Sequence, residues 1–118
     1  MDFDNNTPIY IQLVEELRIS IISGKIKPNE RIASVRELAL QKKVNPNTMQ
    51  KALTELENMK LIYTERTNGK FVTNDIKLID EFKQKYADDL SFNYVKNMKS
   101  LGYKIDEIIE IIKESEEK

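Results

Sequence analysis

Two helix-start signals follow each other closely in the middle of this chain, and they constrain its fold more than any other feature. Ser34 and Glu37 form an S-x-x-E capping box, the signature of a helix amino terminus. Asn45 and Pro46 give a second start, with a capping asparagine followed by proline at the first helical position. The first of these helices must therefore be short and end near Lys42. The pair is a helix-turn-helix candidate.

A longer helix is predicted before this pair and a β-hairpin directly after it. Thr7 as cap and Pro8 as first helical residue start the longer helix, along which apolar residues recur at helical spacing. Segment 61–73 reads as two short strands around the turn pair Asn68-Gly69. We expect left-handed backbone torsions at both turn residues and a hairpin tip that packs against nothing. The order helix, helix, turn, helix, hairpin predicts a winged helix-turn-helix, a mainly α fold with a small β-hairpin, over residues 1–74.

Residues 75–118 are predicted to form a short helical tail. Apolar residues spaced by four indicate a helix from Ile76 to about Leu90, a second helix is expected over 92–98, and a third begins near Asp106. Their apolar surface exceeds what three short helices can hide, so we expect the tail to pair with its copy in a homodimer. The alternative is that the tail folds back onto the first module. The predicted dimerisation residues are Phe92, Val95, Met98, Leu101, Tyr103, Ile105, Ile108, Ile109 and Ile112.

Charge is segregated along the chain although the net charge is only −1. Residues 25–70 carry ten basic and five acidic side chains, whereas residues 1–24 and 71–118 are both net acidic. A phosphate backbone is bound by local lysine and arginine density rather than by the average charge. The basic central module is therefore compatible with double-stranded DNA as a partner.

Several function classes lack the side chains that they require. The chain has no histidine and no cysteine, and it shows no phosphate-binding glycine loop and no carboxylate pair in a metal-ligand arrangement. We therefore expect neither an enzyme nor a metal or cofactor site. No signal peptide and no membrane-spanning apolar run is recognisable, which favours a cytoplasmic protein without a membrane partner.

Polar residues occupy the positions at which a helix-turn-helix would read DNA. If the apolar stripe of the helix from Pro46 faces the core, then Asn47, Thr48, Gln50 and Lys51 face solvent near its amino terminus. Amide and hydroxyl groups can pair with base edges, and an ammonium can reach guanine or phosphate. The other candidates for DNA contact are Arg36 beside Ser34, and the hairpin residues Arg66, Asn68, Gly69 and Lys70.

These residues resemble a known family. The stretch IISGKIKPNERIASVRELALQKKVNPNTMQKALTELENMKLIYTERTNGKFVT is similar to the DNA-binding domain of GntR-type bacterial regulators, and VNPNTMQKALTELE with a short tail resembles the YtrA subgroup. The resemblance covers residues 8–73. It implies a repressor that acts as a homodimer on a near-palindromic operator, frequently controlling an ABC-transporter operon. It places DNA contacts on Ser34, Arg36, Asn45, Asn47, Thr48, Gln50, Lys51, Asn68, Gly69 and Lys70.

The sequence departs from the family pattern at a few positions. Asn29 and Asn68 stand where glycine is common, and both are residues that tolerate a left-handed backbone, so we expect the turns to survive. Pro46 and Gln50 replace arginines of other branches, which leaves the operator sequence open. An alternative function is a winged helix that makes only protein contacts. That alternative predicts an apolar or acidic recognition face. Whether a small-molecule effector binds is left open by the sequence.

Overall fold

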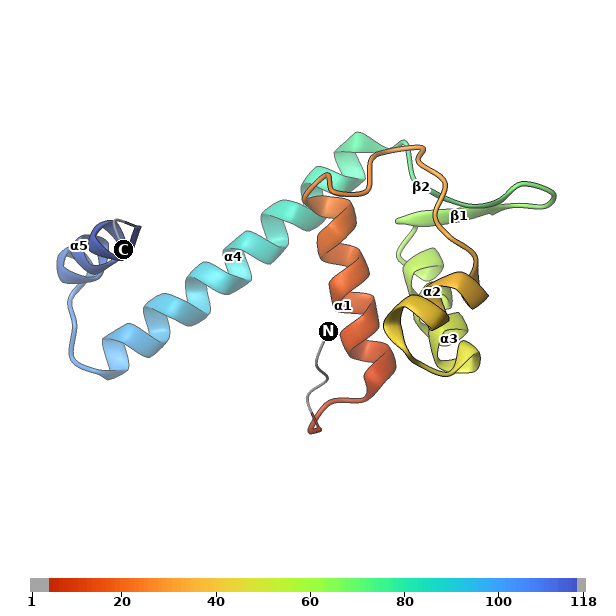
Figure 1. Cartoon of the computed structure of the whole chain (residues 1–118). Helices are drawn as coiled ribbons and strands as arrows, with labels where there is room; N and C mark the ends of the chain where they lie inside the picture. Colours follow the sequence, from red (N-terminus) through yellow and green to blue (C-terminus); the bar gives the residue numbers. More distant parts are fainter. Residues whose placement is uncertain (1–4, 117–118) are drawn as a thin grey trace. The chain divides into compact units, whose positions relative to one another are not determined.

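The computed structural model describes residues 5–116 and has the predicted winged helix-turn-helix architecture followed by helices (Figure 1). The ends of the two predicted domains, residues 1–4 and 117–118, lie outside the described residues. The elements in chain order are α1 (Ile9–Ile22), α2 (Val35–Lys42), α3 (Pro46–Asn58), β1 (Ile62–Glu65), β2 (Gly69–Val72), α4 (Ile76–Ser100) and α5 (Ile105–Glu116). The chain divides into two units, one up to Phe82 and one from Lys83.

The first unit has a core built on α3. Both α1 and α2 pack against α3, and β1 follows it closely. Each helix contributes the apolar face that its sequence spacing predicts, and the hairpin closes the core with the residues at its base. The buried apolar residues of these elements are Leu13, Val14, Leu17, Ile21, Ile22, Leu38, Ala39, Met49, Ala52, Leu53, Leu56, Leu61, Ile62 and Val72.

The caps of the helix-turn-helix are formed as predicted. The Ser34 hydroxyl accepts a hydrogen bond from the amide of Glu37 at 3.1 Å, which satisfies a free donor of the first turn of α2. The Asn45 side chain accepts from the amide of Asn47 at 2.7 Å, and Pro46 is the first residue of α3. Lys43 ends α2 with a left-handed φ of 57°, which turns the chain sharply between the two helices.

The predicted start of α1 was wrong by one position. Pro8 is the cap rather than the first helical residue, because its ψ of 141° is extended, and no side chain caps the helix. The carbonyl of Pro8 accepts from the amides of Ile11 and Gln12, so the helix begins at Ile9. The Thr7 carbonyl accepts a 2.8 Å hydrogen bond from the Gln12 side chain. The start of α1 is therefore stabilised by hydrogen bonds to the backbone carbonyls of Thr7 and Pro8, one of them from the Gln12 side chain.

The hairpin is antiparallel, with Ile62 opposite Val72 and Glu65 opposite Gly69. The prediction of left-handed torsions at both turn residues was half right. Gly69 has a φ of 99°, whereas Asn68 is absent from the non-glycine residues with positive φ. The amide of Asn68 donates to the carbonyl of Glu65, so this turn needs one left-handed residue only.

A segment before α2 runs along the other side of β2. Val72 exchanges hydrogen bonds of 2.9 Å with this segment, donating to Glu30 and accepting from Asn29, and Arg31 bridges to Phe71. The sequence predicted a turn here, and Asn29 does take the expected left-handed φ, at 65°. The residues after Asn29 then form the extended partner of β2, which the turn signal did not reveal.

The tail contains one long helix where two were predicted. α4 is continuous for 25 residues, without a break between Leu90 and Phe92. Apolar residues spaced by four move gradually around an α-helix, because the helix has 3.6 residues per turn. The change of spacing after Leu90 therefore marked a shift of the apolar face and not the end of the helix. No glycine or proline interrupts the segment. The helix ends before Gly102, whose φ is 96°, and α5 begins at Ile105.

Candidate nucleic-acid interface

α3 presents an exposed polar stripe, and we refer to α3 as the recognition helix. Asn47, Gln50, Lys51 and Thr54 are spaced by three or four residues, so they lie on one side of the helix. All four are exposed, as predicted for the first three of them. Thr48 is half-buried, so its hydroxyl is less accessible than the sequence suggested.

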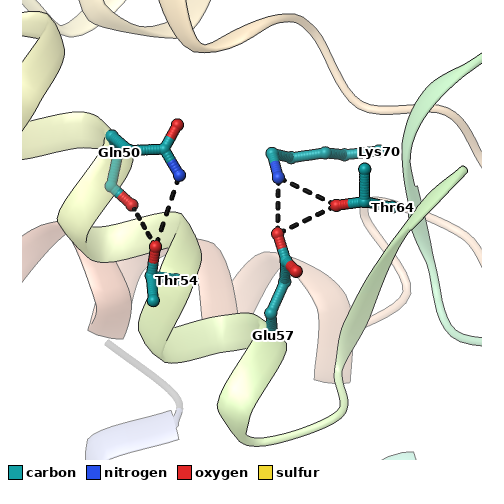
Figure 2. Close-up of polar contacts among 5 residues, drawn as sticks. All are labelled: Gln50, Thr54, Glu57, Thr64 and Lys70. Carbon is teal, nitrogen blue, oxygen red and sulfur yellow. Dashed lines mark hydrogen bonds and ion pairs between the residues drawn. The ribbon is translucent and has the colours of Figure 1, made fainter. Parts of the chain in front are cut away.

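Two residues that the sequence analysis did not select organise this stripe. The Thr54 hydroxyl donates to the carbonyl of Gln50 at 2.9 Å and accepts from the Gln50 side-chain amide at 3.3 Å (Figure 2). The Lys51 ammonium lies 3.9 Å from the centroid of the Tyr10 ring, in cation–π geometry. The spacing of four between Gln50 and Thr54 could have indicated the first contact, whereas the second joins α1 to α3 and had no local signal.

A shallow hollow separates the amino-terminal ends of α1 and α3. Its volume is about 450 Å³, and it is lined by Ile9, Tyr10, Asn47, Thr48 and Lys51. Three of the predicted DNA-contacting residues thus line the same hollow as the aromatic ring of Tyr10 on α1.

The remaining predicted contacts on the helix pair lie at helix amino termini. Ser34, Arg36 and Asn45 are all exposed. The oxygens of Ser34 and Asn45 already accept backbone hydrogen bonds as caps, but the hydroxyl hydrogen and the amide NH₂ group remain as donors. Arg36 is in the first turn of α2, where amide groups and the helix dipole favour an anion.

The hairpin carries cations in two different environments. Arg66 and Asn68 are exposed in the turn, whereas Lys70 is largely covered, with its side chain only 17% exposed. Arg31, which the sequence analysis did not select, donates from Nε to the carbonyl oxygen of Asn68 at 2.9 Å. A carbon atom added at Gly69 would lie 3.2 Å from that Nε atom. The expectation that the hairpin tip packs against nothing was therefore wrong.

Lys70 belongs to a closed cluster of three side chains, which we call the Glu57 clamp (Figure 2). Its ammonium forms an ion pair with Glu57 on α3 and donates to the Thr64 hydroxyl at 2.9 Å. The same hydroxyl donates to Glu57 at 2.9 Å. The hydrogen bond from Lys70 lowers the pKa of the Glu57 carboxyl, against the opposing effect of burial. The carboxylate is therefore held in its charged form.

The predicted dimerisation residues differ in exposure. Phe92, Leu101, Tyr103, Ile105, Ile109 and Ile112 are exposed, with Phe92 at 69% and Leu101 at 73%. Val95 and Met98 are half-buried. Ile108 is fully buried in the single chain, so it offers no free surface to a partner. A hollow of about 430 Å³ lies among Phe92, Val95, Lys96 and Lys99 of α4.

Within residues 5–116, no group of three or more acidic, histidine or cysteine side chains is arranged to hold a metal ion. None of the helices described is long and apolar enough to cross a membrane.

Comparison with known proteins places this geometry in context. Residues 9–72 match the model of the gntR family of bacterial regulatory proteins. The chain is 35% identical over 111 residues to the HTH-type transcriptional regulator YhcF of Bacillus subtilis, a match that covers 94% of this chain and 92% of YhcF. It is 38% identical over 77 residues to the transcriptional repressor YtrA of the same organism, covering 65% of this chain and 59% of YtrA.

Solved structures agree with these relatives. A GntR family transcriptional regulator from Listeria monocytogenes superposes with a TM-score of 0.90 at 38% identity, covering 95% of this chain and 98% of that one. The DNA-binding domain of AraR in complex with the operator ORR3 superposes with a TM-score of 0.55 at 33% identity, covering 62% of this chain and 88% of that domain.

Proposed function

Because this chain belongs to the gntR family of bacterial regulatory proteins, and is thus a DNA-binding transcription regulator, we propose that it acts as a homodimer on a near-palindromic operator. The observation that carries the proposal is the exposed polar stripe of α3, at the position of the recognition helix in a helix-turn-helix that is followed by a hairpin wing. The related AraR domain has been crystallised on operator DNA.

We assign base reading to the recognition helix. Asn47 and Gln50 carry amides that can pair with adenine, and Thr48 and Lys51 can contact a thymine methyl and a guanine respectively. Arg36 with the caps Ser34 and Asn45 would then bind phosphate at the amino termini of α2 and α3. Arg66, Asn68 and Gly69 would bring the wing to the DNA backbone. These roles are supported by the exposure of the assigned side chains, apart from the half-buried Thr48, and by the net positive charge of residues 25–70.

We assign dimerisation to the tail. Six of its nine predicted interface residues are exposed in the single chain, so their apolar side chains are open to a partner. A second copy of the same tail is the economical cover, because a two-fold pair of recognition helices also matches a palindromic operator. Linking two half-site contacts raises affinity by about 10²–10⁴ when the geometry allows both.

Repression is the mode of action that we propose, since the similar protein YtrA is a repressor by name. The resemblance to the YtrA subgroup also supports an operon for an ABC transporter as the target class. The rival function, a winged helix that binds only protein, requires an apolar or acidic recognition face. The exposed stripe of α3 bears amides, a hydroxyl and an ammonium, which favours DNA.

A gel-shift titration tests the proposal. The full-length protein is titrated on the DNA upstream of its own gene and on a shuffled duplex of the same composition, at two salt concentrations. We expect tighter binding to the upstream DNA, and a loss of affinity on both duplexes at the higher salt. Equal binding to both duplexes would contradict sequence-specific regulation of its own operon. Sedimentation of the free protein as a monomer would contradict the assignment of the tail.

A further inference from the structure

We propose that Glu57 and Lys70 are positioning residues, whose ion pair fixes the wing to the recognition helix and leaves the Lys70 charge unavailable to DNA. The inference rests on the proposed DNA-binding function and deepens it, because it separates the two cations of the wing into Arg66, which faces DNA, and Lys70, which does not. It replaces the DNA-contacting role that the family resemblance implies for Lys70.

The position of Glu57 on α3 is the first step. It follows Gln50 by seven residues, or about two helical turns, and therefore lies on the same side of the helix. Figure 2 shows both side chains on this side of α3. An unpaired carboxylate on this side would repel the phosphates that Lys51 and the helix amino terminus attract. Lys70 cancels that charge at its source.

The geometry of the hairpin is the second step. Thr64 and Lys70 are cross-strand partners, so their side chains lie on the same face of the wing. This face is turned towards Glu57, which the Thr64 hydroxyl contacts. The contacts close a triangle, in which each of the three side chains touches the other two. The clamp therefore holds both strands of the wing, beyond the buried base residues Ile62 and Val72.

The burial of Lys70 is the third step. Its side chain is 17% exposed, compared with 74% for Lys85 on the surface of α4. To contact a DNA phosphate, a lysine must have an ammonium that can leave its protein partners at a low cost in free energy. To do so, the Lys70 ammonium would have to break its contacts with the Glu57 carboxylate and the Thr64 hydroxyl together. The partly buried Glu57 would then lose its ion-pair partner, which is unfavourable.

A set of full-length variants tests the proposal through the salt dependence of DNA binding. The pair Glu57–Lys70 has no net charge, so the neutral double variant Glu57→Gln/Lys70→Met should keep the wild-type slope of log K against log salt on a non-specific duplex. A phosphate contact by Lys70 would instead lower that slope by about 0.9. Arg66→Met is the matched control, since it removes an exposed cation from the same hairpin. Loss of slope in the double variant would overturn the proposal.

Affinity for the operator provides a second comparison. Lys70→Met should weaken binding by about five- to tenfold, because the wing loosens and Glu57 is left unpaired. Adding Glu57→Gln should restore part of the loss, and the conservative Lys70→Arg should keep near wild-type affinity. If Lys70 bound DNA directly, Glu57→Gln alone would tighten operator binding, because it would free the lysine from its carboxylate partner, and that result would overturn the proposal.

Hydrogen exchange of the free protein separates this proposal from the proposed function. In Lys70→Met and in Glu57→Gln/Lys70→Met, the amides of β1 and β2 should exchange about five- to tenfold faster than in the wild type, whereas those of α1 should not change. Unchanged exchange in the wing would overturn the clamp. A wild-type protein that binds no DNA would refute the proposed function, while the exchange rates would still report on the clamp.

Discussion

Arg31 and Asn68 are 37 positions apart in sequence, yet the guanidinium Nε of Arg31 donates a 2.9 Å hydrogen bond to the Asn68 carbonyl oxygen. The segment before α2 therefore holds the turn of the wing. The wing is thus fixed at two levels, by Arg31 near its tip and by the Glu57 clamp further down.

We predict that Arg31→Met increases the exchange rate of the Asn68 amide by about tenfold, because a hydrogen bond from a charged donor to the turn is lost. Arg31→Lys should not restore protection, since an ammonium cannot reproduce the Nε geometry. Exchange measured by NMR on the free protein provides the readout, and the Gly24 amide in the distant turn after α1 is the internal control. Identical exchange at Asn68 in both variants and the wild type would contradict the prediction.

Gly69→Val should lower both DNA affinity and stability. The φ of 99° is strained for any side chain, and a Cβ atom would press on Arg31 at 3.2 Å. We expect a loss of about 1–3 kcal/mol in the free energy of unfolding, measured by urea denaturation. Gly24→Val is a useful comparison, because its φ is also positive but a Cβ would meet nothing within 4 Å. Unchanged stability of Gly69→Val would contradict both the backbone strain at this φ and the contact with Arg31.

Substitutions on the recognition helix should separate specific from non-specific binding. Asn47→Ala and Gln50→Ala each remove a group assigned to base edges, so operator binding should weaken by about 1–3 kcal/mol while binding to random DNA stays nearly intact. Thr54→Val removes only the hydroxyl that holds Gln50, and it should give a smaller loss of the same kind. Titration on operator and random duplexes measures both. Equal losses on the two duplexes would contradict base reading.

The stability of the protein should depend on pH through Glu57. Lys70 holds the pKa of this carboxyl below its usual 4.5, so the folded state binds the proton more weakly than the unfolded state. The stabilisation is fully present above the unfolded pKa and is lost as the pH falls through the folded pKa. Between about pH 6 and pH 3, the thermal midpoint of the wild type should therefore fall more than that of Glu57→Gln. Parallel curves for the two proteins would contradict the prediction.

Truncation tests where the DNA-binding module ends. Ile79 on α4 is buried, with 7% of its surface exposed, and the first unit extends to Phe82. A chain that ends at Phe82 should fold and bind the operator far more weakly than the full protein, because it lacks all the predicted dimerisation residues, which begin at Phe92. A chain that ends at Asn74 should also lose about 2 kcal/mol of stability, since it lacks the burial of Ile79. Urea denaturation and sedimentation of both chains test this, and tight operator binding by either would contradict dimerisation through the tail.

Local signals were sufficient to predict the helix-turn-helix. The caps Ser34 and Asn45 act on amides two or three residues away, so the information lies within one helical turn of sequence. The apolar residues of α3 recur at helical spacing, so they indicate which face of the helix is buried and, by exclusion, which face is exposed. This is why the polar face of the recognition helix could be predicted without a structure.

Contacts between distant segments were missed for the same physical reason. From sequence alone, Lys70 is interpreted as an exposed cation of the wing, because only the fold brings Glu57 beside it. Arg31 is likewise interpreted as part of a turn, because only the fold aligns its segment with β2. Tyr10 and Lys51 meet only because α1 packs on α3. The break wrongly predicted before Phe92 arose differently, from reading a drift of the apolar face as the end of a helix.

The alignment of residues 29–32 with β2 has a consequence for how the protein avoids self-association. β2 pairs with β1 on one side and with this segment on the other, so among the described residues it has no free backbone edge. An open strand edge is a template for strand addition from another chain and for aggregation. In this wing only β1 keeps such an edge, and it is four residues long, exposed from Tyr63 onward and ends in the charged Glu65. A short polar edge of this kind is a poor template, so the wing can project from the domain without recruiting the wing of a neighbouring molecule.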